Sequence, residues 1–128
     1  SLLPWNRGAD PNLWSFLEDT PKGVSIHFID PGIDTGNLIA QKEIAFEGPG
    51  QTLRTTYNRL SKEIELLFEG IWSQLIVGNI RSWAQPYGGS LHFLKDKERY
   101  EGFLTQLGWD TPVKSLIGKA LQDQASFI

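Results

Sequence analysis

The sequence of 128 residues contains no cysteine and no methionine, and it has only two histidines. The absence of cysteine excludes disulfides, a thiolate zinc site and a cysteine nucleophile. The two histidines, His27 and His92, do not belong to a cluster with metal-ligand spacing, so we expect no bound metal. No apolar run approaches the roughly 18 residues that span a bilayer, so we expect no membrane partner.

Positive charge is also scarce, with 12 Lys and Arg against 15 Asp and Glu and a net charge of -3. Because there is no polybasic patch, we do not expect nucleic acid as the main ligand. Hydrophobic residues make up 40% of the chain and aromatic residues 12%, which excludes a disordered chain and fits one ordinary domain. No signal-peptide pattern follows Ser1, so we expect a cytoplasmic location, and the missing methionine indicates processing or a longer protein.

Hydrophobic periodicity predicts three short elements in the first third of the chain. Asp10 followed by Pro11 predicts the N-cap and first turn of a helix that ends near Leu17. The alternation of apolar and polar residues over Gly23–Ile29 predicts a half-buried strand, and a second strand is expected over Leu38–Phe46.

The strongest predicted element is a helix from about Thr52 to Val77, with Thr52 as its N-cap and Gly78 as its C-terminal glycine. Apolar residues recur at steps of three and four along it and form one face, which we expect to be the main packing partner of the sheet. These residues are Leu53, Tyr57, Leu60, Ile64, Leu67, Phe68, Ile71 and Leu75.

After Gly78 the pattern is weaker. It predicts short strands over Ile80–Trp83 and Ser90–Leu94, and helices over Asp96–Leu107 and Thr111–Gln122. So few strands do not make a self-contained sheet. The order helix, strand, turn, strand, helix therefore predicts an α/β fold and indicates the second part of a larger sheet.

The turn over Asp30–Gly36 and the strand histidine His27 are the candidate reactive groups. Loops held between strands are common positions for reactive side chains, but Asp, Pro and Gly are also ordinary turn formers. His27 precedes Asp34 by seven residues and could be a base oriented by that carboxylate. Its place on the strand favours the alternative, a half-exposed strand residue with a satisfied hydrogen bond.

Three stretches, in this order, resemble the formyltransferases that use N10-formyltetrahydrofolate. They are Ser1–Pro4 with Arg7 and Gly8 after it, then Gly23–His27, then Ile33–Gly36. That family includes enzymes acting on glycinamide ribonucleotide, on methionyl-tRNA and on nucleotide-linked amino sugars. The resemblance covers roughly the first half of the chain, and the long helix fits the helix that follows these motifs in the family's Rossmann-type fold.

The amino-acid sequences of Pro4–Asn12 and Gly108–Pro112 are most similar to those of the sugar N-formyltransferases. This resemblance implies transfer of a formyl group to the amine of a nucleotide-linked, typically dTDP-linked, amino-deoxy sugar. Two other readings stay open. The chain could come from a glycinamide ribonucleotide formyltransferase or a formyltetrahydrofolate hydrolase, or it could be a non-catalytic interaction module.

The resemblance also implies roles for individual residues. The aspartate of the family's Asp-x-Gly element falls on Asp34, which would orient a histidine and assist proton movement, and His27 would be a supporting residue. N10-formyltetrahydrofolate would be the co-substrate. The residues implied to line its site are Leu2, Leu3, Pro4, Pro31, Gly32, Ile33 and Asp34.

The family's catalytic asparagine and histidine form an Asn-x-His element just upstream of its Ser-Leu-Leu-Pro motif, and this sequence starts at that serine. We therefore expect a fragment that is inactive alone. Residues 1–78 would be the C-terminal part of the catalytic domain, and residues 79–128 a small α+β region involved in dimerisation. Expected partners are the folate, the nucleotide sugar, and either a second copy or the missing N-terminal half.

Overall fold

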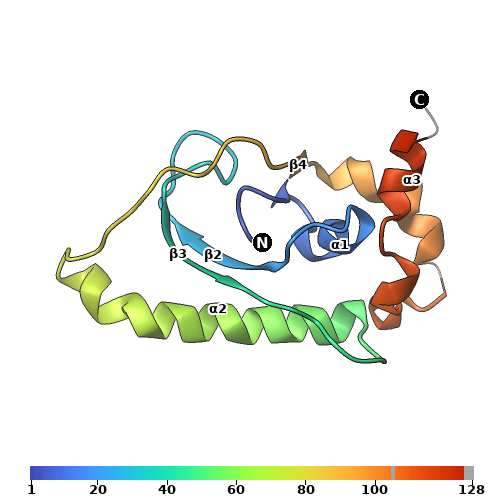
Figure 1. Cartoon of the computed structure of the whole chain (residues 1–128), viewed down its shortest axis with the longest axis horizontal. Helices are drawn as coiled ribbons and strands as arrows, with labels where there is room; N and C mark the ends of the chain where they lie inside the picture. The colour runs from blue at the N-terminus through green and yellow to red at the C-terminus, as the bar shows by residue number, and fades with distance from the viewer. Residues whose placement is uncertain (105, 126–128) are drawn as a thin grey trace.

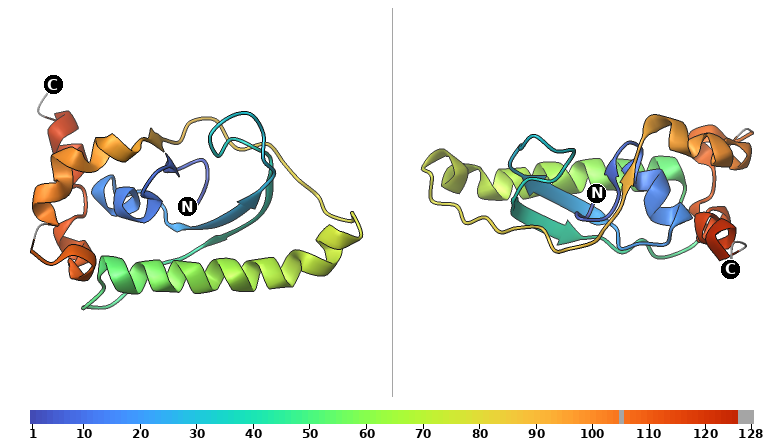
Figure 2. Two further views of the ribbon diagram at one scale, coloured as in Figure 1. Left: turned by 180° about the vertical axis from the view of Figure 1, so that it is seen from behind. Right: turned by 90° about the horizontal axis from the view of Figure 1, so that it is seen from above.

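The computed structural model describes residues 1–104 and 106–125. Strands β2 (Gly23–His27) and β3 (Leu38–Glu43) form an antiparallel pair, and the long helix α2 (Leu53–Ile76) runs along it. Helix α1 (Pro11–Leu17) and the C-terminal helices gather at one end (Figure 1). The segment after α2 returns along the side of the molecule opposite that helix and reaches β4 (Leu91–His92) (Figure 2).

The β2–β3 pair forms where the alternating pattern predicts it, although both strands are shorter than expected. Strand β2 ends at His27 rather than Ile29, because the register shifts between Ile26 and His27 and the pattern of burial breaks there. Phe28 is consequently 45% exposed instead of continuing the buried face. At the other end, Gly23 permits close approach, since a Cβ at this position would lie 2.2 Å from the Lys42 carbonyl oxygen.

Helix α2 confirms the prediction in its extent and in both ends. The Thr52 hydroxyl accepts a hydrogen bond from the Thr55 N–H, and the Thr55 hydroxyl accepts one from the Thr52 N–H, which makes a reciprocal cap. Gly78 follows the helix with φ of 72°. The helix contacts both β2 and β3, as expected for the main packing partner of the strands. Several of its apolar side chains are nevertheless exposed, including Tyr57 and Trp72.

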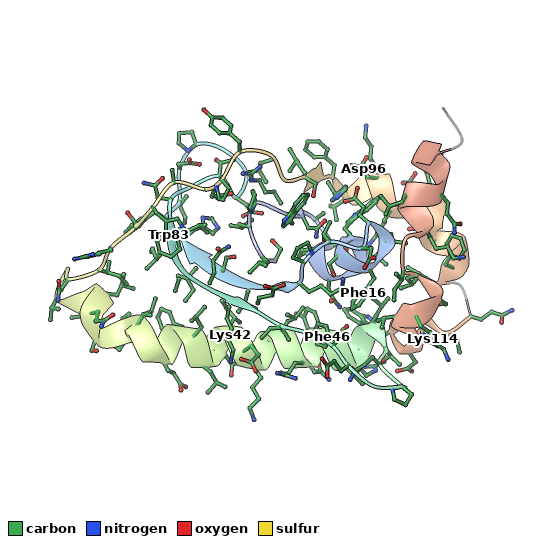
Figure 3. The ribbon with its side chains drawn as sticks, in the orientation of Figure 1. Phe16, Lys42, Phe46, Trp83, Asp96 and Lys114 are labelled. Atoms are coloured by element: carbon green, nitrogen blue, oxygen red, sulfur yellow. The ribbon has the colours of Figure 1, made fainter. Side chains whose placement is uncertain are left out.

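A buried carboxylate joins α2 to β3. Glu63 accepts hydrogen bonds from the Lys42 ammonium at 2.7 Å and from the Arg59 guanidinium at 2.9 Å. These two cations hold the pKa of Glu63 below its usual range, with the hydrogen bond from Lys42 the largest cause. Figure 3 shows Lys42 on the side of the strand that faces α2.

The first residues contain a strand that the sequence pattern did not predict. Arg7–Gly8 form β1, which pairs in parallel with β4, so this segment is joined to residues more than 80 positions away. Asp10 does occupy the N-cap of α1, but its φ is 52° and its side chain caps no N–H. The side chain pairs instead with the Lys97 ammonium at 3.3 Å, which removes it from the helix end.

The hydrophobic core lies at the end of the molecule where α1, the start of α2 and the C-terminal helices meet. Phe16 of α1 packs near Phe46, with ring centroids 6.1 Å apart (Figure 3). The buried members of this core are Leu13, Trp14, Phe16, Leu17, Leu53, Tyr100, Val113, Leu116 and Ala120.

The C-terminal third departs from the predicted helices. The expected helix over Asp96–Leu107 is a 3₁₀ helix, η1 (Leu94–Phe103), followed by a short η2 (Gly108–Asp110). The expected helix over Thr111–Gln122 is divided into η3 (Val113–Ser115) and α3 (Lys119–Ala125). Gly118 lies between η3 and α3 and has a positive φ, which a helix does not contain, so the helix cannot continue through it.

The expected strand over Ile80–Trp83 is reduced to a single bridge. Trp83 exchanges two backbone hydrogen bonds with Leu38, at 2.7 and 3.0 Å. Within the described ranges, no helix is both long and apolar enough to cross a membrane.

Candidate functional site

The candidate site lies in the loop that joins β2 to β3. Asp34 has φ of 54°, a left-handed conformation that is uncommon for a residue with a Cβ. Its Oδ2 accepts a hydrogen bond from the Gly8 N–H at 2.8 Å, and its Oδ1 lies 3.6 Å from His27 Nε2. The structure therefore brings together the two residues that the sequence singled out. The Asp34 side chain is 41% exposed, so a substrate can reach it.

The hydrogen bonds of His27 define which of its ring nitrogens faces Asp34. Nδ1 lies 2.7 Å from the Phe28 carbonyl oxygen, which can only accept, so Nδ1 carries a proton. Nε2 then faces Asp34 and can gain or release a proton beside a carboxylate. This geometry is suited to moving a proton at the end of β2.

Asp30, the other carboxylate of the loop, has a local structural role. Its Oδ1 accepts from the Thr35 hydroxyl at 2.6 Å and from the Gly32 N–H at 2.9 Å. The hydrogen bond from Thr35 is the largest cause that lowers the pKa of Asp30. Asp30 therefore fits the reading as a turn former, whereas Asp34 is held by contacts from outside the loop.

Gln85 also supports the loop, although no sequence motif predicted this role. Its amide Nε2 donates to the carbonyl oxygens of Asp34 and Gly36, each at 2.8 Å. Gln85 stands 51 residues after Asp34. No local pattern around it indicates a contact with this loop, because the contact depends on the path of the returning segment.

The residues implied to bind folate fall in two places. Leu3 and Pro4 are buried beside β2, where the Leu3 N–H donates to Ser25 Oγ at 3.0 Å and Gln41 donates to the Leu3 carbonyl at 2.7 Å. Pro31, Gly32 and Ile33 are exposed on the loop. The folate-binding role of both groups stays a prediction.

A cavity of about 580 Å³ opens between α1, β2 and α2. Its lining is mostly apolar and includes Leu2, Leu13, Val24, Leu53, Leu60 and Ile64. Neither Asp34 nor His27 lines it. Of the residues implied to bind folate, Leu2 is the one that does.

His92 lies apart from this site and has structural contacts. Its ring stacks on Trp14 with centroids 3.8 Å apart, and its Nε2 lies 2.7 Å from a Glu18 carboxylate oxygen. The described part of the chain holds no group of three His, Cys, Asp or Glu that could bind a metal ion.

Residues 1–70 match the family model described as formyl transferase. This match covers more than half of the chain, so the chain belongs to the formyl transferase family. The resemblance read from the three N-terminal motifs is confirmed.

Two solved structures indicate which members of the family are similar. The formyltransferase PseJ from Anoxybacillus kamchatkensis, in complex with UDP-4,6-dideoxy-4-formamido-L-AltNAc and tetrahydrofolate, is 61% identical with a TM-score of 0.90. The match covers 94% of this chain and 62% of that chain. An N-formyltransferase from Helicobacter canadensis, in complex with folinic acid and dTDP-3-aminofucose, is 28% identical with a TM-score of 0.70. That match covers 75% of this chain and 36% of the Helicobacter chain.

Among the curated proteins, cytosolic 10-formyltetrahydrofolate dehydrogenase from Homo sapiens is 34% identical over 121 residues, covering 91% of this chain and 12% of that protein. The chain thus spans less than two thirds of each of these relatives. The similarity to PseJ confirms the predicted α/β formyltransferase fold and the closeness to nucleotide-sugar N-formyltransferases.

Proposed function

We propose that the full-length protein containing this chain transfers the formyl group of N10-formyltetrahydrofolate to the amine of a nucleotide-linked amino-deoxy sugar. The observation that carries the proposal is the Asp34 carboxylate, held by the Gly8 N–H with His27 Nε2 at 3.6 Å, in a chain of the formyl transferase family. The complexes of PseJ and of the Helicobacter enzyme with nucleotide sugars support the sugar amine as acceptor.

In the proposed reaction the amine nitrogen attacks the formyl carbon and a tetrahedral intermediate forms. The bond between that carbon and N10 then breaks, which leaves a formamide on the sugar and releases tetrahydrofolate. One proton leaves the attacking nitrogen and one reaches N10. Asp34 would assist this proton movement and His27 would support it, because a carboxylate beside an imidazole can accept and return a proton.

The folate is proposed to bind across the β2–β3 loop, at Pro31, Gly32 and Ile33, with Leu2, Leu3 and Pro4 at the inner side. Two observations support this placement. Pro31–Ile33 are exposed next to Asp34, and among the described residues no hydrogen-bond partner is found for the main chain of Ile33. A flat heterocycle rich in donors and acceptors could pair with such a main chain.

Two nucleotides, dTDP and UDP, are candidates for the carrier of the amino sugar. The sequence resemblance favours dTDP, whereas the 61% identical PseJ is in complex with a UDP sugar. The decisive assay incubates the full-length protein with N10-formyltetrahydrofolate and either UDP-4-amino-4,6-dideoxy-L-AltNAc or a dTDP-linked amino sugar. Formamide product is followed by mass spectrometry and tetrahydrofolate by absorbance.

Formylation of a nucleotide sugar, with loss of activity in Asp34→Asn, is the expected result. Release of formate into water without transfer would identify a formyltetrahydrofolate hydrolase, one of the alternatives that the sequence resemblance left open. Formylation of glycinamide ribonucleotide in preference to either sugar would also overturn the proposal.

We also propose that residues 1–128 alone do not turn over, because the family's Asn-x-His element is not among them. An oxyanion donor and a base are each worth about 10²-fold or more in rate. Multiple turnovers by the isolated chain would contradict this.

We also propose that the full-length protein is a homodimer and that residues 79–128 mediate the contact. Sedimentation over a dilution series tests the dimer.

A further inference from the structure

The conformation of Asp34 needs support from outside its own loop. A left-handed φ of 54° at a residue with a Cβ is unfavourable, and it persists where neighbouring contacts determine it. The Gly8 N–H holds the carboxylate. The main-chain carbonyl oxygen of Asp34 is held by a different residue.

That residue is Gln85, in the segment that returns from α2 to β4 and passes beside the β2–β3 loop (Figure 1). A primary amide carries two N–H donors. Gln85 uses them on the carbonyl oxygens of Asp34 and Gly36, both at 2.8 Å. Gly36 lies close to the end of β2, since a Cβ there would lie 1.7 Å from the Phe28 carbonyl oxygen.

The orientation of the Gln85 amide is determined by Arg7. The guanidinium donates from Nε at 3.2 Å and from Nη2 at 2.7 Å to Gln85 Oε1. A guanidinium has only donors and a carbonyl only accepts, so the amide oxygen must face Arg7 and the amide nitrogen must face the loop. Arg7 also donates to the Gly88 carbonyl at 3.3 Å, which ties the returning segment to β1.

These contacts close a ring. Arg7 orients Gln85, Gln85 holds the Asp34 carbonyl, and the Asp34 carboxylate accepts from Gly8, the residue after Arg7. The main-chain carbonyl and the carboxylate of Asp34 are therefore both positioned by contacts that lead to Arg7 and Gly8 of β1. A carboxylate placed in this way can keep its position when substrate arrives, and displacement by about 1 Å can cost about 10²-fold in rate.

We propose that Gln85 is a positioning residue for formyl transfer, which holds Asp34 in its productive conformation and is itself oriented by Arg7. This inference rests on the proposed function of Asp34. It assigns to the C-terminal part of the chain a direct role in building the site.

The sharpest test is Gln85→Glu in the full-length protein. The substitution keeps the shape and the pairing with Arg7 but places an oxygen without protons against two carbonyl oxygens. Gln85→Leu removes the donors without adding charge, and it serves if the Glu variant fails to fold. Gln122→Glu, at an exposed position, makes the same chemical change elsewhere.

We expect kcat to fall by about tenfold or more in Gln85→Glu, with KM for both substrates within about twofold and Gln122→Glu unchanged. In an Asp34→Asn background the Gln85→Glu change should have little further effect, because Gln85 acts through Asp34. An unchanged kcat, or a full and additive loss in the Asp34→Asn background, would overturn the proposal.

Amide hydrogen exchange separates this inference from the proposed function. We expect faster exchange in peptides covering residues 30–37 of Gln85→Glu and Gln85→Leu than of the wild type and Gln122→Glu. If the wild type transfers no formyl group, the proposed function fails, and the exchange data still decide whether Gln85 holds the loop. Unchanged exchange in that loop would refute the positioning role.

Discussion

The N–H of Gly8 points at the carboxylate of Asp34, 26 residues later, and donates to its Oδ2 at 2.8 Å. The parallel ladder between β1 and β4 explains this direction. The N–H groups of Arg7 and Ala9 bond to the carbonyls of Ser90 and His92, so the intervening Gly8 N–H points away from β4. The first strand thus supplies a fixed donor to the candidate site.

Replacing Gly8 with alanine tests this donor. Gly8 has φ of 88°, and a Cβ there would lie 2.3 Å from the His92 carbonyl oxygen. We expect Gly8→Ala to lower the free energy of unfolding by about 1–3 kcal/mol and to reduce formyl transfer. Gly70→Ala is the control, since its Cβ would meet no atom within 4 Å and a helical alanine should stabilise by about 0.5–1 kcal/mol. Thermal unfolding and the transfer assay report both effects, and equal behaviour of the variants would contradict the prediction.

Removing the charge of Asp34 tests its proposed part in proton movement. Asp34→Asn keeps the size of the side chain and an oxygen for the Gly8 N–H, so the fold should be retained. We expect kcat to fall by about 10²-fold or more. Asp110→Asn, at an exposed ion pair with Arg54, should leave the rate unchanged. A kcat within about threefold of the wild-type value would show that Asp34 is not required.

The Glu63 cluster predicts a dependence of stability on pH. Lys42 and Arg59 lower the pKa of Glu63, so its ionised form stabilises the folded state above the ordinary glutamate pKa of about 4.3. This contribution is lost as the pH falls through the lowered value. We expect Glu63→Gln to lower Tm at neutral pH and to approach wild type in acid. Glu65→Gln, on the exposed side of α2, should show a smaller change at every pH, and a pH-independent loss in Glu63→Gln would contradict the assignment.

The reciprocal cap at the start of α2 predicts the effect of Thr52→Ala. This change removes the hydroxyl that accepts from the Thr55 N–H at 3.1 Å. We expect a loss of about 1 kcal/mol in the free energy of unfolding, measured by denaturant titration. Ser73→Ala, at an exposed position near the other end of α2, should stay within about 0.5 kcal/mol of wild type. If both variants lose the same amount, the cap is not the cause.

The sequence predicted best the elements whose determinants are close together in the chain. The spacing of apolar residues, the Thr52 cap and Gly78 are all local, and α2 begins and ends where they indicate. The prediction failed where distant contacts override local preference. Asp10 has the type of an N-cap residue, but pairing with Lys97 and a φ of 52° divert its side chain.

The same division applies to the site. The sequence by itself determined the family and singled out Asp34 and His27, because their motifs are short and ordered along the chain. Only the tertiary structure decided that Gly8 and Gln85 hold Asp34 from two sides. These contacts join residues 26 and 51 positions apart. A backbone N–H or a single amide has no sequence signature, so its partner is set by the path of the folded chain.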